Sequence, residues 1–383
     1  MSPLLHIFLY VSFGIILYFF CKKLYNVPNS EFWKLASFII IIFALIEGVR
    51  YGRGVDYYSY KYRYEHLGIE EEPQILFKWI MQCLTNLGAN YVVAFISYSL
   101  LFVWGVFFYI HKSYSKNECC WMYFFALVSM TLSAESMIRQ YIAQAFIFFA
   151  LPYIGDKKHI WMFFIYALCA ILIHSGVAIQ IPVLLLSFYL IHTTLNWKIW
   201  CILLFISYYL LPEGYLVNQS IGLLQKLHLD SVLGFENVSH YIDDSDRWLG
   251  EDSVLDAAKQ SFLTMSLQFI FEFSVIFSSC NILKKNPNHK VLFLFNIAAI
   301  GFILCRLFHG YEIFTRMFQQ LYIYWFVPVG FVAINLSRNI INKNRKQSLY
   351  IKYAFYLICL YQIFYWGRFV FLFPKAMFFW DKV

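Results

Sequence analysis

The sequence predicts an all-α polytopic membrane protein with about twelve transmembrane helices and one additional interfacial helix. Three observations indicate this class: 61% of the 383 residues are hydrophobic, only 14% are charged, and the mean hydropathy is +0.60. A soluble protein of this length carries roughly 25% charged residues, because its surface faces water. The composition therefore excludes soluble, disordered, coiled-coil and disulfide-rich secreted classes.

The predicted spans follow from the length of each apolar run, since a helix needs about 20 mostly apolar residues to cross a bilayer. Eight runs are clear: 4–21, 33–49, 91–110, 176–193, 261–283, 291–308, 316–337 and 349–367. Four more are short or broken: 119–133, 140–154, 160–173 and 199–212. The first run lacks a basic flank and a small-residue cleavage site, so we expect an uncleaved span. Together these runs predict a single integral membrane domain over residues 1–383.

Residues 74–90 form an amphipathic segment rather than a lipid-soluble one, because Lys78, Gln82 and Asn86 interrupt its apolar residues. If this segment does not cross, the lysine-rich short loops all lie on one side of the membrane, as the positive-inside rule requires. These loops include 111–118, 155–159, 194–198, 284–290 and 338–348. We therefore expect an interfacial or re-entrant helix at 74–90 and both termini outside.

Arginine has a different distribution from lysine under this topology. Eight of the ten arginines lie outside or near the outer boundary: Arg50, Arg53, Arg63, Arg139, Arg247, Arg306, Arg316 and Arg368. Arginine is a planar, permanently charged side chain that binds phosphate through two parallel hydrogen bonds. The asymmetry predicts an anion-binding surface on the outer face.

The outer loop at 50–73 contains the first candidate site. Gly52 and Gly54 flank Arg53 and allow the backbone to approach a ligand closely. Asp56 follows, and then a tyrosine-rich stretch that begins at Tyr57 and includes Tyr60. The combination suits an anionic head group beside a sugar, although tyrosine and arginine also collect at membrane interfaces without any ligand.

Three further candidates lie at outer ends of predicted spans. Arg139 falls in the first turn of a helix, where anions are favoured, and the alternative is a boundary arginine that reaches toward the head groups. His174 interrupts an apolar stretch and is either a general base or a structural, hydrogen-bonded histidine. Arg316 is either a second phosphate ligand or the partner of Glu312 in an i,i+4 ion pair.

Metal chemistry has little support in the sequence. Asp243, Asp244 and Asp246 form a D-x-D pattern, but their large outer loop at 213–260 lies opposite the cytoplasmic nucleotide sugars that such a motif would bind. The nine cysteines show no metal-ligand spacing and resemble small buried hydrophobic residues. We expect no metal and no cofactor.

The ordered set of motifs resembles the EpsG family of polysaccharide polymerases, which are related in role to the Wzy O-antigen polymerases. The matching residues are Gly52-Arg53-Gly54-Val55-Asp56-Tyr57 with Tyr60, Glu72-Pro73, Met137-Ile138-Arg139-Gln140 with Ala143, His174-Ser175 and Arg316. The resemblance implies a GT-C-like helical glycosyltransferase of the bacterial cytoplasmic (inner) membrane whose active site faces the periplasm. It also implies donor and acceptor oligosaccharides linked to undecaprenyl diphosphate, used for O-antigen or exopolysaccharide.

Roles for single residues follow from this chemistry together with the resemblance. Arg139 and Arg316, with Arg53 as a third candidate, would stabilise the leaving diphosphate. Asp56 and His174 compete for the role of general base, with Asp56 preferred and His174 orienting the acceptor. In addition, Tyr57 and Tyr60 would contact sugars.

The rival class is a flippase or transporter of lipid-linked oligosaccharide, which needs a cationic cavity open to both faces. Polar residues would then run through the middle of several spans. Here most spans are apolar at their centres, which favours the enzyme. The expected partners are the lipid-linked substrates and the lipid bilayer, with a chain-length regulator protein as a further candidate and no nucleic acid.

Overall fold

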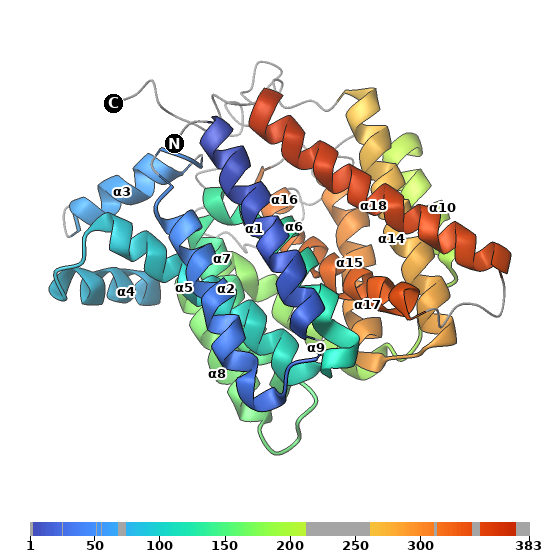
Figure 1. Ribbon diagram of the computed structural model, residues 1–383, viewed down its shortest axis with the longest axis horizontal. Helices are drawn as coiled ribbons and strands as arrows, with labels where there is room; N and C mark the ends of the chain where they lie inside the picture. The colour runs from blue at the N-terminus through green and yellow to red at the C-terminus, as the bar shows by residue number, and fades with distance from the viewer. Residues whose placement is uncertain are drawn as a thin grey trace, which may run out of the picture. The chain divides into compact units, whose positions relative to one another are not determined.

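The computed structural model describes residues 3–24, 26–50, 52–54, 56–67, 74–211, 261–309, 312–338 and 345–372, and these residues form helices joined by short turns (Figure 1). They cluster into two compact units. The first comprises Met1–Ala178, Ala333–Arg338 and Gln362–Val383, and the second comprises Ile179–Val332 and Asn339–Tyr361. The all-helical prediction is confirmed for the described part of the chain.

Within the described residues, the first unit contains eight complete α-helices and the C-terminal ends of two more. They are α1 (Pro3–Leu24), α2 (Phe32–Gly48), α3 (Tyr57–Glu65), α4 (Ile75–Asn86), α5 (Tyr91–Ser113), α6 (Lys116–Ser136), α7 (Ile138–Ala150), α8 (Ile160–Ile173) and the C-terminal parts of α17 (Phe326–Ser337) and α18 (Arg345–Leu372). Its core consists of α5 packed against α2 and α7, and α7 packs in turn against α8. The short helices α3 and α4 lie one above the other at the left edge of Figure 1.

The second unit is built from the later helices. They are α9 (Gln180–Leu190), α10 (Trp197–Phe205), α14 (Phe262–Lys285), α15 (His289–Leu307), α16 (Glu312–Tyr322), most of α17 (Phe326–Ser337) and the N-terminal part of α18. α15 packs against α16, α9 and α14, so it is the central helix of this unit. Gly301 permits the close approach of α15 to α16, because a Cβ atom at that position would lie 2.5 Å from the backbone nitrogen of Tyr322.

Each of the twelve predicted spans overlaps a helix in the part of the chain that the structure describes. Within the described residues, five helices are long and apolar enough to cross a membrane: Leu4–Leu24, Tyr91–Ser113, Phe262–Lys285, His289–Leu307 and Thr315–Ser337. The chain is therefore a membrane protein with several apolar helices. The count of twelve crossings and the GT-C-like arrangement stay predictions.

Prolines explain why some predicted spans are interrupted. A proline ring clashes with the carbonyl four residues earlier, so a regular helix breaks there. Pro328 stands four residues after Tyr324. Tyr324 lies in the 3-10 turn Ile323–Trp325, which separates α16 from α17. In the same way Pro182 stands four residues after Ala178. Ala178 lies in the 3-10 turn Ser175–Ile179, which precedes α9.

The segment predicted to be interfacial forms α4, which has 12 residues and is about 18 Å long. That length is well below the hydrocarbon thickness of about 30 Å. Phe77 and Met81 are buried against the first unit, whereas Ile75 and Trp79 are exposed. Gly88 ends the segment with a φ of 74°, a conformation that favours glycine. The interfacial placement of α4 stays a prediction.

We predict that Gly301→Ala lowers the stability of the protein by about 1–3 kcal/mol, because the new methyl group meets backbone atoms of α16 that cannot rotate away. Gly14→Ala is the matched control, since a Cβ atom there has no neighbour within 4 Å. Thermal unfolding in detergent measures both variants. Equal midpoints for Gly301→Ala and the unchanged protein would contradict the close packing of α15 on α16.

Candidate functional site

Asp56 and Tyr60 lie one turn apart at the start of α3. Asp56 is the residue before the helix, and its carbonyl accepts a hydrogen bond from the Tyr60 amide at 3.0 Å. Its side chain is half-buried, whereas the Tyr60 ring is buried. Because residues i and i+4 share one face of a helix, the local sequence alone places these two side chains near each other.

Arg139 contacts the same tyrosine from the first turn of α7. Its Nε donates a hydrogen bond to the Tyr60 hydroxyl at 2.9 Å, and its guanidinium carbon lies 5.7 Å from the centroid of the Tyr60 ring. Asp56 also acts electrostatically on Tyr60. The tertiary structure thus gathers Asp56, Tyr60 and Arg139, which come from two separate parts of the sequence.

The Tyr60 hydroxyl stays protonated in this setting. Burial raises its pKa above the ordinary value of 10.0, the Arg139 guanidinium partly opposes that rise, and the Asp56 carboxylate adds to it. A neutral phenol accepts the hydrogen bond from Arg139 and keeps its own O–H as a donor. The contact between Tyr60 and Arg139 is therefore insensitive to pH across the physiological range.

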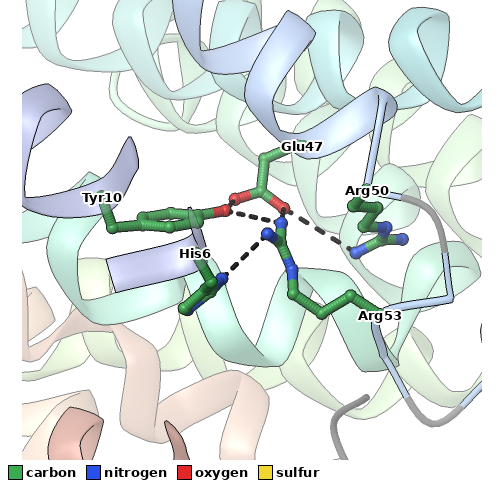
Figure 2. A network of polar contacts seen from close by, with 5 residues as sticks. All are labelled: His6, Tyr10, Glu47, Arg50 and Arg53. Atoms are coloured by element: carbon green, nitrogen blue, oxygen red, sulfur yellow. Dashed lines mark hydrogen bonds and ion pairs between the residues drawn. The ribbon is translucent and has the colours of Figure 1, made fainter. Parts of the chain in front are cut away.

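Arg53 occupies a different environment from Arg139, because its guanidinium is enclosed in a buried polar network (Figure 2). Nη1 donates to His6 Nδ1 at 2.8 Å, and Nη2 donates to the Tyr10 hydroxyl at 3.0 Å. Nη2 also lies 3.7 Å from Oε2 of Glu47. The protein itself thus supplies these partners of the Arg53 guanidinium.

Glu47 is the centre of this network. The Tyr10 hydroxyl donates a hydrogen bond to its Oε1, while its Oε2 lies 3.7 Å from the Nη atoms of both Arg50 and Arg53. His6 accepts from Arg53 at Nδ1, so the neutral imidazole carries its proton on Nε2. The cluster joins α1, the last turn of α2 and the turn that contains Arg53.

The turn around Arg53 requires its two glycines. Gly52 and Gly54 have φ values of 70° and 100°, a region that other residues rarely adopt. The Gly54 carbonyl accepts a hydrogen bond from the Tyr57 amide at 3.1 Å, which leads the chain into α3. The Gly-Arg-Gly sequence therefore shapes the approach to Asp56.

A pocket in the first unit lies between α2, α5 and α7. Glu47 and Arg50 supply its charged wall, and both are buried to 3% exposure or less. Ile138, Tyr141 and Ile142 also line the pocket and belong to the helix that carries Arg139.

His174 ends α8, the partner of α7 in a helical hairpin. The chain turns back between α7 and α8, so His174 at the end of α8 and Arg139 at the start of α7 belong to the same end of the hairpin. His174 Nδ1 accepts a hydrogen bond from the Gly176 amide at 3.1 Å. The neutral ring consequently carries its proton on Nε2 and presents a donor there.

Tyr57 has a packing role in the structure. Only 2% of the residue is exposed, and its ring meets those of Phe95 and Tyr91 edge to face at centroid distances of 5.2 and 6.4 Å. These contacts attach α3 to α5.

Arg316 belongs to the second unit, where it is half-buried on α16. One turn later, Gln320 accepts a hydrogen bond from Gln180 at 3.0 Å, and Gln180 accepts one from the Tyr324 hydroxyl at 2.8 Å. This buried amide network fixes the rotation of α16. The side chain of Glu312, the alternative partner of Arg316, lies outside the described residues.

The comparison with protein families decides the identity of the chain. The model of the EpsG family matches residues 33–374, which include every motif residue on which the resemblance was based. The chain belongs to the EpsG family. Comparisons with curated proteins and with solved structures give no match. Family membership, together with the apolar helices, indicates a membrane protein with a role in polysaccharide polymerisation.

Two charged residues of this EpsG-family chain, which the structure shows to be buried beside Arg53, were not predicted as site residues from the sequence. Glu47 was not a candidate, and Arg50 was counted only among the outer arginines. The signal was present, since an acidic residue at the end of an apolar span is costly and usually functional. Glu272, in the second unit, is a comparable buried carboxylate in α14 and accepts a hydrogen bond from Gln268 at 3.0 Å.

Two sequence-based expectations concern other parts of this EpsG-family chain. In the part that the structure describes, no group of three or more His, Cys, Asp or Glu side chains is arranged to hold a metal ion. The D-x-D pattern at 243–246 and the large outer loop at 213–260 lie outside the described residues.

We predict that Tyr60→Phe lowers the stability of this EpsG-family protein by about 1–3 kcal/mol, because the Arg139 guanidinium loses a buried hydrogen-bond acceptor. Tyr62→Phe is the matched control on the same helix, since Tyr62 is 48% exposed. Thermal unfolding in detergent provides the comparison. An unchanged midpoint for Tyr60→Phe would mean that its contact with Arg139 does not hold α3 to α7.

Proposed function

We propose that this protein is a polysaccharide polymerase, a membrane glycosyltransferase for O-antigen or exopolysaccharide. It transfers a growing glycan from undecaprenyl diphosphate to the non-reducing end of another lipid-linked repeat unit, at the periplasmic face of the bacterial inner membrane. The observation that carries the proposal is the cluster of Arg139, Tyr60 and Asp56. It places a permanent positive charge and a carboxylate around one buried tyrosine.

The chemistry needs these two groups in different roles. The acceptor hydroxyl gives its proton to the Asp56 carboxylate while its oxygen forms a bond to the anomeric carbon of the donor glycan. The bond from that carbon to the diphosphate oxygen breaks, and undecaprenyl diphosphate leaves with the electron pair. Arg139 stabilises the negative charge that develops on the leaving group.

His174 is proposed to orient the acceptor rather than to remove its proton. Because Nδ1 already accepts the Gly176 amide, the Nε2–H group is a hydrogen-bond donor. A donor can hold a sugar oxygen but cannot take a proton at that nitrogen. This tautomer supports Asp56 as the general base.

The remaining candidate residues are assigned supporting roles in glycan transfer. Arg316 is proposed as a second phosphate ligand. Arg53 contributes through the turn that it anchors, because its guanidinium donates to His6 and Tyr10. Of the two tyrosines expected to contact sugar, Tyr60 is favoured because the Tyr57 ring packs against α5. A chain-length regulator protein is proposed as a further partner.

We predict that Arg139→Ala and Asp56→Asn each reduce polymerisation about 100-fold or more, since each removes a group that acts in the transition state. Each variant is expressed in a polymerase-null strain, and glycan ladders are compared on gels at equal protein levels. Arg63→Ala is the control, a half-buried arginine in the last turn of α3.

The same gels separate the two function classes. Accumulation of single repeat units at the outer face supports a polymerase, because a flippase defect would stop even one unit from reaching that face. Normal ladders from both Arg139→Ala and Asp56→Asn would contradict the site.

We predict that His174→Gln keeps more activity than His174→Ala, because the glutamine amide places a donor near the position of Nε2. Glycan transfer by membranes that contain each variant measures the difference. Equal losses in the two variants would argue that His174 acts as a proton acceptor.

A further inference from the structure

The Glu47 carboxylate is nearly completely buried, at 1% exposure, in the last turn of α2. It touches three separate segments: Tyr10 in α1, Arg50 just after α2, and Arg53 in the glycine turn. A buried ion pair that loses one partner leaves an uncompensated charge, which is strongly unfavourable. Replacing Glu47 would therefore disturb all three segments together.

Arg53 connects the Glu47 carboxylate to the turn that precedes Asp56 in the proposed site. Its guanidinium is held by Glu47, Tyr10 and His6, and Figure 2 shows these groups converging on it from different helices. The flanking glycines give the backbone wide freedom, so the turn depends on its side-chain anchor.

Asp56 follows the turn after only one intervening residue. The Gly54 carbonyl binds the Tyr57 amide, and the Asp56 carbonyl binds the Tyr60 amide. Tyr60 then accepts the Arg139 hydrogen bond at 2.9 Å. A continuous series of contacts thus runs from Glu47 to the candidate base and the candidate phosphate ligand.

We propose that Glu47 is a positioning residue for glycan transfer, which sets the place of Asp56 through the Glu47–Arg53 ion pair. The inference rests on the proposed function. In this role Glu47 acts through Arg53, and its carboxylate also contacts Tyr10 and Arg50.

The test compares Glu47→Gln, which keeps the shape but removes the charge, with Glu47→Asp, which keeps the charge. The full-length purified protein is supplied with lipid-linked repeat units extracted from cells that lack this polymerase. We expect Glu47→Gln to lower kcat about 10- to 100-fold with little change in KM, because a small displacement of a reacting group slows the chemical step. Glu47→Asp should recover part of kcat.

The matched control is Glu272→Gln, which also removes a fully buried carboxylate but lies in the second unit. It should leave kcat per folded molecule unchanged. Should Glu47→Gln fail to fold, Tyr10→Phe is the second variant. It removes the hydroxyl that donates to Oε1 of Glu47 and accepts from Arg53, and it is expected to lower kcat in the same direction.

Hydrogen–deuterium exchange supplies a readout that does not depend on the reaction. Amides of residues 49–60 should exchange faster in Glu47→Gln than in the unchanged protein or in Glu272→Gln. The positioning role would be overturned if Glu47→Gln changed neither the exchange rates nor kcat. It would also be overturned if Glu47→Gln only reduced the amount of folded protein and left kcat per folded molecule unchanged. If the protein without substitutions makes no polymer, the proposed function fails. Faster exchange in Glu47→Gln would in that case still support the structural link between Glu47 and the turn before Asp56.

Discussion

Burial of the Arg53 guanidinium is the constraint on which the arrangement of the first unit depends. The residue is 0% exposed, and an unpaired charge in that position would cost several kcal/mol. The fold meets the constraint with a carboxylate from α2 and two hydrogen-bonding side chains from α1. Those contacts bring α1, α2 and the glycine turn together, and the start of α3 follows from the turn.

A second polar contact extends this arrangement to α7. Arg139 and Tyr60 are 79 residues apart in the sequence, and their hydrogen bond joins α3 to the helical hairpin of α7 and α8. Arg53 and Arg139 thus lie in different environments. Arg53 is completely buried among Glu47, Tyr10 and His6, whereas Arg139 is half-buried and donates a hydrogen bond to Tyr60.

Several features of the fold could be predicted from local sequence. Long apolar runs predicted α1, α5, α14 and α15 with small errors at their ends, since helix length in a membrane follows directly from hydrophobicity. The predicted run 316–337 matches the membrane-length helix Thr315–Ser337, but the 3-10 turn between α16 and α17 within it was not predicted, although Pro328 marks it. Hydropathy averages do not register the clash of a proline ring with the carbonyl of Tyr324, and that clash decides where the helix ends.

The sequence by itself determined the helical class, the EpsG family and the residues from which a site could be built. Periodicity, hydropathy and short motifs depend on neighbours along the chain, so they can be read without a structure. Only the tertiary structure decided that Glu47 pairs with Arg53, that Tyr60 receives Arg139, and that His174 presents Nε2–H. Hydrogen bonds and ion pairs act over a few ångströms, and most of these partners come from distant segments that only folding brings within reach.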